Sequence, residues 1–180
     1  DETTLRLKLD FDLDRDLTAK LLLSQVDMDD PADIWTIDGS LNTLSDRPGM
    51  DAQKTDTLGL KFLKKNRFSE FQSLTSTTNT DVVFSYDADW GNVDSHAPYT
   101  YDYFSQTLRN RKSFGQEFRL VSNENFETER LPFSWVLGVS YLKLDETNDR
   151  QDDGLYGDPQ DPFSPYSSLT ISSSDYSSEK

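Results

Sequence analysis

Hydrophobic and polar residues alternate along three long stretches of the chain. Side chains alternate between the two faces of a β-strand, so a period of two predicts strands with one apolar and one polar face. The stretches cover residues 4–26, 55–86 and 113–144, and each is interrupted by a short polar segment that can reverse the chain. The pattern therefore predicts three long antiparallel hairpins, or about six strands, with the tight turns together at one end. The turns are predicted near residues 14–16, 65–67 and 123–130.

The first and third stretches show the alternation most clearly. In residues 5–13 every second residue is Leu or Phe, and the residues between them are charged. In residues 133–142 every second residue is large and apolar, and the residues between them are mostly small. The arms run to about ten residues, above the roughly 5–6 typical of soluble strands. The apolar residues predicted to share one face include Leu5, Leu7, Leu9, Leu21, Leu23, Leu60, Trp135, Leu137 and Val139, and the opposite face carries Arg6, Lys8, Asp10, Lys20, Lys61, Glu117 and Arg119.

Three segments show no sustained alternation: residues 27–53, 87–112 and 145–180. They are predicted to be long loops, the last of them either a loop or a disordered tail. Residues 27–53 carry seven acidic residues and one basic residue, and residues 145–180 carry nine and two. Most of the net charge of −15 is therefore expected at the end of the sheet opposite the tight turns.

Two architectures fit strands of this kind. A soluble β-sandwich turns its apolar faces inward and has connections of similar length at both ends. A transmembrane β-barrel turns its apolar face towards lipid, with strands of about 9–11 residues, short turns on one side and long loops on the other. Strand length and unequal connections favour an all-β, antiparallel transmembrane β-barrel segment with long acidic extracellular loops. Residues 1–180 are then one partial barrel domain, and the apolar set should point away from the barrel axis and be exposed in an isolated piece.

Composition argues against several functions. The net charge of −15 argues against nucleic-acid binding, which needs a basic surface. There is no cysteine for a disulfide or a thiolate metal site. The single histidine, His96, lies in a predicted loop without the partners of a catalytic triad, and no phosphate-binding glycine loop or metalloprotease motif occurs. We therefore expect that the protein is not an enzyme.

Three stretches of the chain resemble strands of TonB-dependent outer-membrane receptors. The resemblance covers roughly residues 3–145 and implies a large barrel in the bacterial outer membrane that imports a scarce small ligand, such as a ferric siderophore. It also implies several partners: outer-membrane lipid, the remainder of the barrel, a plug domain, and an energy-coupling protein that acts through the plug. The stretches are Leu5-Arg6-Leu7-Lys8-Leu9 with Phe11; Leu74-Thr75-Ser76-Thr77-Thr78 leading to Tyr86, Asp87 and Asp89; and Gln116-Glu117-Phe118-Arg119-Leu120 with Ser122, Trp135, Gly138 and Tyr141.

The chain also departs from that family. No segment resembles the plug, and about six strands are far fewer than a barrel of this class requires. We therefore expect a contiguous piece of the barrel wall, which cannot transport a ligand alone. A soluble β-sandwich binding module, for example one that binds carbohydrate, and a passive porin-type barrel are the alternatives.

Two sets of residues are candidate sites. Exposed aromatic rings in the predicted loops can stack on a small ligand, although they can also pack the loops together or lie at the membrane boundary. Residues 149–160 have the spacing of a calcium-binding loop at Asp153 and Gly154, whereas Gln151 and Gln160 are poor ligands, so a solvated acidic loop is the alternative. No cofactor other than this possible Ca²⁺ in the acidic loops is expected. The candidate ligand-binding residues are Trp35, Trp90, Tyr99, Tyr101 and Tyr103, and the candidate metal ligands are Asp149 and Asp153.

Overall fold

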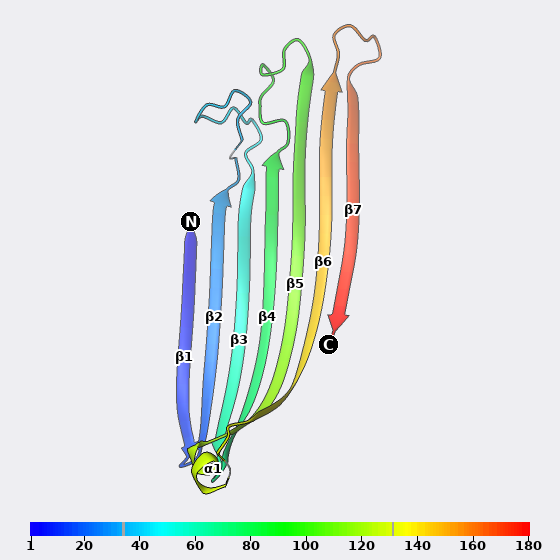
Figure 1. Cartoon of the computed structure of the whole chain (residues 1–180). Helices are drawn as coiled ribbons and strands as arrows, with labels where there is room; N and C mark the ends of the chain where they lie inside the picture. Colours follow the sequence, from blue (N-terminus) through cyan, green and yellow to red (C-terminus); the bar gives the residue numbers. More distant parts are fainter. Residues whose placement is uncertain (34, 131) are drawn as a thin grey trace.

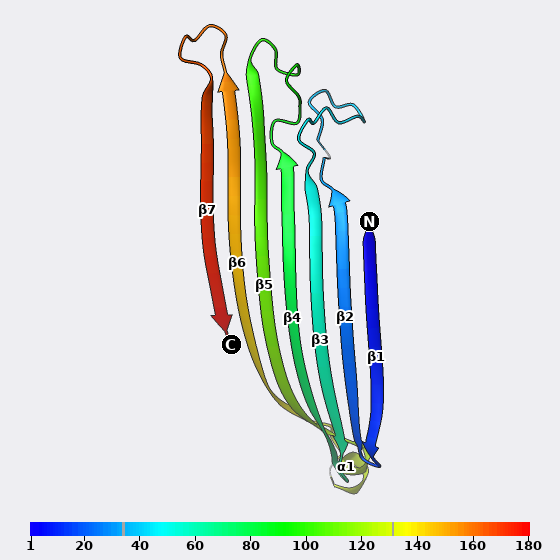
Figure 2. The same ribbon diagram turned by 180° about the vertical axis from the view of Figure 1, so that it is seen from behind.

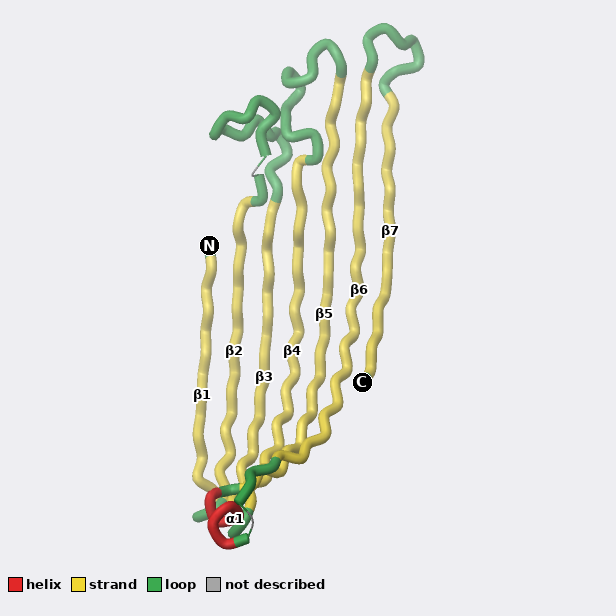
Figure 3. Tube along the Cα trace, in the orientation of Figure 1, coloured by secondary structure: helices red, strands yellow, loops and turns green. Residues whose placement is uncertain are grey.

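The computed structural model describes residues 1–33, 35–130 and 132–180 and contains one seven-stranded antiparallel sheet (Figure 1). The strands lie in sequence order from β1 to β7, so neighbours in the sheet are also neighbours along the chain. The sheet is a single layer that bends at the end marked by a short helix, α1 (Figure 3). The elements are β1 Glu2–Asp14, β2 Leu17–Pro31, β3 Met50–Lys65, β4 Ser69–Asp87, β5 Thr100–Ser122, α1 Glu124–Glu129, β6 Val136–Gly157 and β7 Tyr166–Glu179.

Three connections lie at one end of the sheet and three at the other, and the predicted placement of the turns is confirmed (Figures 1 and 2). Residues 15–16 join β1 to β2, and residues 66–68 join β3 to β4. Residues 123–135, which include α1, join β5 to β6 at the same end. The long loops 32–49 and 88–99 lie at the opposite end.

Helix α1 is held against the β3–β4 turn by its N-cap. The side-chain oxygen of Asn123 accepts a hydrogen bond from the backbone N–H of Phe126 (3.3 Å), and its amide donates to the carbonyl of Asn66 (3.0 Å). The Phe126 ring packs edge-on against Phe133 and Trp135, each with centroids 5.8 Å apart. Trp135 was predicted to lie on a strand, but it precedes β6 and belongs to this small cluster.

The prediction was wrong in the number of strands and in the extent of two loops. β5 begins at Thr100, inside the predicted loop 87–112. β6 continues to Gly157, and β7 then fills residues 166–179, so most of the predicted loop 145–180 is strand. These segments carry Ser, Thr, Tyr and charged residues on both faces, so they show no hydrophobic period. Backbone hydrogen bonds between neighbouring strands hold them in the sheet instead.

The pairing register gathers the apolar side chains on one side of the sheet, the apolar face. Residues directly opposite each other in an antiparallel pair point to the same side. Leu9 pairs with Leu21 and Leu21 with Leu60, while on the far strands Phe118 pairs with Val139. The apolar belt on this face comprises Leu5, Leu7, Leu9, Phe11, Leu13, Leu17, Ala19, Leu21, Leu23, Leu58, Leu60, Phe62, Phe71, Phe114, Phe118, Leu120, Leu137, Val139 and Tyr141.

A continuous polar row crosses the same face on the long-loop side of the belt. Gln25 Nε2 donates a hydrogen bond to Asp56 Oδ1 (3.0 Å), and Ser177 Oγ donates to Asp145 Oδ1 (2.6 Å). The row separates the belt from the part of this face nearer the long loops. The separation is incomplete, because Ser73, Thr75 and Gln116 form hydrogen bonds within the belt. Leu108, Leu169 and Ile171 lie on the same face beyond the row. The polar row consists of Gln25, Asp56, Asn79, Lys112, Asp145 and Ser177, each of which is the register partner of the next.

The opposite side of the sheet, the polar face, is a network of polar side chains. Arg111 Nε lies 2.6 Å from Glu146 Oε2, and Thr55 Oγ1 donates to Thr80 Oγ1 at 3.1 Å. The register also places the predicted charged residues on this face, as expected. These are Arg6, Lys8, Asp10, Lys20, Lys61, Glu117 and Arg119.

The sheet is open and uncovered. β1 and β7 are its two edges, and the described residues form no second layer, so neither a closed barrel nor a two-sheet sandwich is present in this chain. Among these residues Ala19 is the one buried apolar side chain, whereas Leu5 and Leu137 are each 68% exposed. The predicted exposure is confirmed for most of the apolar set, while Leu21, Leu60 and Trp135 are half-buried. No helix in the described part of the chain is long and apolar enough to cross a membrane.

Candidate functional site at the loop end of the sheet

The loops 32–49 and 88–99 pack against each other at the end opposite α1. Trp35 from the first loop stacks on Trp90 from the second, with ring centroids 5.6 Å apart and an interplanar angle of 20°. Trp90 has a left-handed backbone conformation (φ 61°), which costs an ordinary residue roughly 1–2 kcal/mol. The stacking of two large aromatic rings offsets part of this cost.

A close backbone approach at Gly91 brings the loops together. Its carbonyl accepts a hydrogen bond from the backbone N–H of Asp46 (2.9 Å). A Cβ atom at this position would lie 2.8 Å from both Ile37 Cδ1 and Ser95 Cβ, inside normal van der Waals contact. Any larger residue at position 91 would therefore have to displace the Ile37 and Ser95 side chains.

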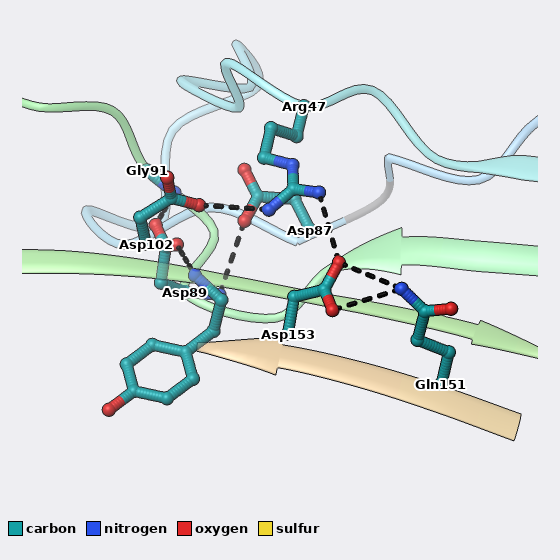
Figure 4. A network of polar contacts seen from close by, with 8 residues as sticks. Arg47, Asp87, Asp89, Gly91, Asp102, Gln151 and Asp153 are labelled. Carbon is teal, nitrogen blue, oxygen red and sulfur yellow. Dashed lines mark hydrogen bonds and ion pairs between the residues drawn. The ribbon is translucent and has the colours of Figure 1, made fainter. Parts of the chain in front are cut away.

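Asp89 ties the second loop to the start of β5. Its two carboxylate oxygens accept hydrogen bonds from the backbone N–H groups of Gly91 (3.0 Å) and Tyr103 (2.7 Å) (Figure 4). Burial raises the pKa of this carboxyl above its ordinary value, and the negative charges of Asp87 and Asp46 act in the same direction, whereas the two N–H groups oppose them. The loop end is therefore an acidic region in which burial disfavours the charged form of Asp89.

Arg47 attaches the first loop to the apolar face above the polar row. Its guanidinium pairs with Asp102 of β5 (3.2 Å) and Asp153 of β6 (3.6 Å), and lies 4.4 Å from the centroid of the Phe104 ring (Figure 4). Asp102, Phe104 and Asp153 are on one face of the sheet by register and alternation. One arginine thus joins a loop and two strands, although its own 37% exposure limits the strength of the ion pairs.

Aromatic rings also gather on the polar face at the loop end. The Tyr101 ring contacts His96, Tyr103 and Tyr156, with centroid separations of 5.2, 5.7 and 5.1 Å. Gly154 is the register partner of Tyr103, and a Cβ there would lie 2.6 Å from the Tyr103 ring, so glycine lets the ring lie across β6. Such a surface can stack on a flat or sugar-like ligand.

A small cavity lies between loop 32–49 and the end of β4. Its lining includes Asp33, Ser45 and Asp87, beside the stacked Trp35 and Trp90. The Asp87 side chain is only 3% exposed. Within the described residues, neither Asp87 Oδ2 nor Ser45 Oγ has a hydrogen-bond partner, although both atoms are buried.

The structure divides the five predicted aromatic residues between these two surfaces. Trp35 and Trp90 form the inter-loop stack, while Tyr101 and Tyr103 lie on β5 and not in a loop. Tyr99 ends the second loop. Sequence reasoning did not name Arg47 or Tyr156 as site residues, because single charged or tyrosine residues in acidic segments carry no distinctive spacing. It named Asp87 and Asp89 only within a stretch that resembles receptor strands, and not as site residues.

The prediction of a calcium-binding loop over residues 149–160 was wrong in its structural basis, because residues 149–157 belong to strand β6. Asp149 Oδ1 accepts a hydrogen bond from Ser173 Oγ (2.5 Å). Asp153 accepts from Gln151 (3.0 Å) and pairs with Arg47. In the described part of the chain no group of three or more His, Cys, Asp or Glu side chains is placed to hold a metal ion.

The chain was compared with known protein families, curated proteins and solved structures, and none of the three comparisons found a match.

Proposed function

We propose that the chain forms seven adjacent strands in the wall of a transmembrane β-barrel of the bacterial outer membrane, with its apolar face in contact with lipid. The observation that carries the proposal is the apolar belt bordered by the polar row on one face of an uncovered sheet. A soluble protein rarely leaves so many large apolar side chains exposed on one uncovered face. Contact with lipid would remove that surface from water without a second protein layer.

The dimensions of the belt support this orientation. In β5 the belt runs from Phe114 to Leu120. From Phe114 to Leu120 there are six steps of about 3.4 Å, so the belt covers roughly 20 Å along β5, somewhat less than the ~25 Å apolar band of outer-membrane barrels. The polar row then lies on the headgroup side of the belt, towards the long loops.

The polar face suits the wet interior of such a barrel. Several of its charged groups are paired across strands, as in Arg111 with Glu146, or within one strand, as in Arg150 with Asp152 (2.9 Å). Hydrogen-bonded Ser and Thr side chains fill the space between them. The two open edges are the places where the remaining strands of the barrel pair.

Within this class, we propose a TonB-dependent receptor that imports a small ligand such as a ferric siderophore. The support is the sequence resemblance of the strands, together with long loops that present aromatic rings at one end. The plug domain and the energy-coupling protein are then required partners outside this chain. A plug domain upstream in the same reading frame supports the receptor, and a complete reading frame without one refutes it and leaves a passive porin-type barrel.

Cysteine scanning tests the membrane orientation, because the chain has no cysteine of its own. We would introduce Leu60→Cys on the apolar face and Lys61→Cys, its neighbour on the polar face, attach a nitroxide, and reconstitute each variant in phosphatidylcholine vesicles. The label at 60 should be relaxed by oxygen, which dissolves in lipid, and the label at 61 by a water-soluble nickel chelate. Equal access of the nickel chelate to both positions would refute the orientation.

A further inference from the structure

We propose that the small cavity between loop 32–49 and the end of β4 binds one Ca²⁺ ion, which fixes the two long loops to each other. The first argument is the unpaired state of two buried oxygens. Asp87 is 3% exposed, yet among the described residues its Oδ2 has no hydrogen-bond partner, and neither has Ser45 Oγ on the same cavity. Buried polar atoms are nearly always paired in folded proteins. Two unpaired oxygens on one cavity therefore point to a shared ligand.

The charge around the cavity selects a cation. Both Asp33 and Asp87 line it. Arg47, the nearby cation in Figure 4, makes its ion pairs with Asp102 and Asp153. Asp33 Oδ1 accepts a hydrogen bond from the backbone N–H of Gly49 (2.8 Å), and Asp87 Oδ1 accepts one from that of Asp89 (3.2 Å). Among the described residues neither carboxylate has a salt-bridge partner, so their two charges match a divalent ion, which would remove the repulsion between them.

The donor atoms and the size of the cavity narrow the choice of ion. The available side-chain donors are carboxylate and hydroxyl oxygens, which suit hard cations and not zinc or copper. The cavity holds about 10 Å³, room for roughly one water-sized sphere, so an organic ligand does not fit. Mg²⁺ keeps several of its waters when it binds, whereas Ca²⁺ accepts varied oxygen ligands in flexible geometry. The site therefore favours Ca²⁺, with backbone carbonyls and water available to complete the coordination.

The position of the site gives the ion a structural consequence. Asp33 and Ser45 belong to the first loop, and Asp87 ends β4 directly before the second. The stacked Trp35 and Trp90 line the same cavity. Binding of Ca²⁺ should therefore hold the loops in the arrangement of this structure, and loss of the ion should free them. This inference does not depend on the membrane orientation of the sheet.

The two tryptophans provide a direct assay, because they can transfer energy to bound Tb³⁺, a luminescent substitute for Ca²⁺. We would use the Trp135→Phe variant, which removes the third tryptophan at the far end of the sheet. Tb³⁺ should give saturable sensitised emission that Ca²⁺ reverses. With only two carboxylates, we expect a dissociation constant in the range of about 10⁻⁴–10⁻³ M typical of weak extracellular calcium sites.

Variants locate the ion. Asp87→Asn should weaken Ca²⁺ binding by at least about tenfold, because ligand charge sets affinity at such sites, and Asp33→Asn and Ser45→Ala should weaken it less. If Asp87→Asn fails to fold, the loss of affinity in Asp33→Asn and Ser45→Ala still tests the site. Asp94→Asn is the matched control, since Asp94 is an exposed acid of the second loop outside the cavity, and it should bind like the parent. Trp90→Phe should reduce the emission, because it removes one of the two energy donors beside the cavity.

Several results would overturn the proposal. One is the absence of sensitised emission, or emission that about 10 mM Ca²⁺ does not reverse, since this exceeds the weakest range expected. Another is equal loss of binding in Asp94→Asn and Asp87→Asn, which would indicate diffuse attraction to acidic loops. A third is displacement of Tb³⁺ by Mg²⁺ as efficient as displacement by Ca²⁺. In that case the coordination argument that favours Ca²⁺ over Mg²⁺ fails.

Discussion

Leu21 and Leu22 are neighbours on β2 that face opposite sides of the sheet, and both are half-buried. Leu21 belongs to the apolar belt, between Leu9 and Leu60, whereas Leu22 lies on the polar face between Lys8 and Gly59. Changing each to arginine therefore makes the same chemical substitution at matched exposure on the two faces. If the apolar face contacts lipid, only one of the two changes should be severely destabilising.

The depth of Leu21 sets the expected magnitude. It lies four residues below Gln25 of the polar row, or about 14 Å along the strand at 3.4 Å per residue. This is near the middle of a ~25 Å apolar band, where an arginine facing lipid costs about 2–4 kcal/mol. Leu22→Arg should cost less than about 1 kcal/mol, mainly through repulsion from Lys8 across the strand pair. Gln25→Arg, at the headgroup level, should also cost about 0–1 kcal/mol.

The measurement is urea unfolding of the vesicle-bound chain, followed by tryptophan fluorescence. The unfolding free energy of Leu21→Arg should fall below that of Leu22→Arg by at least about 1.5 kcal/mol, the smallest gap that the lipid cost allows. On a sheet surrounded by water, two half-buried leucines on neighbouring positions should respond similarly. A difference under about 1 kcal/mol, or a larger loss in Leu22→Arg, would show that lipid does not cover this face.

Three further predictions concern the loop end. Gly91→Ala should separate the loops, because the new methyl must displace Ile37; amide hydrogen exchange in residues 35–46 should accelerate, and unchanged exchange would contradict the close approach. Asp89 has a raised pKa, so the docked loop binds more protons than the open loop between the ordinary and the raised value. The protection of the loop amides from hydrogen exchange should therefore be greatest at low pH and decline as pH rises through that window. Asp89→Asn should flatten this decline. If the variant shows the same decline, a group other than Asp89 causes it. Arg47→Met should cost at most about 1 kcal/mol of loop docking, because the ion pairs are partly exposed. Raising the salt to 1 M should shrink that difference, and a salt-independent loss would indicate that packing on Phe104 dominates.

The strands that carry hydrophobic alternation could be predicted from the sequence, and those without it could not. Residues 5–13 place Leu or Phe at every second position, which fixes both the strand and its faces. β7 is largely Ser with scattered Tyr and Asp, and its pairing depends on backbone hydrogen bonds to β6, which any sequence without proline can make. Strand β7 therefore forms as much because β6 offers backbone hydrogen-bond partners as because of its own residues.

The loop site shows a similar division. Trp35 and Trp90 could be named as candidates because large exposed aromatic rings are uncommon and chemically distinct. That they stack on each other depends on how two loops meet, and no local pattern contains that information. Asp87 is one of 33 acidic residues, and only the fold shows that its carboxylate is buried.

The upper border of the apolar belt slopes from one side of the sheet to the other. On β1 the belt ends at Leu5, which lies in register with the polar row, and on β6 it ends at Tyr141, four residues below Asp145 of that row. Between these strands the border is uneven, because on β4 the belt ends at Phe71. A drop of four residues is about 14 Å over five strand spacings of about 4.8 Å each. If this border lies flat along a membrane surface, the strands must lean by roughly 30° from the membrane normal, near the 35–45° of known outer-membrane barrels. The end points of the belt on β1 and β6 therefore correspond to a strand inclination that can be calculated from this chain alone.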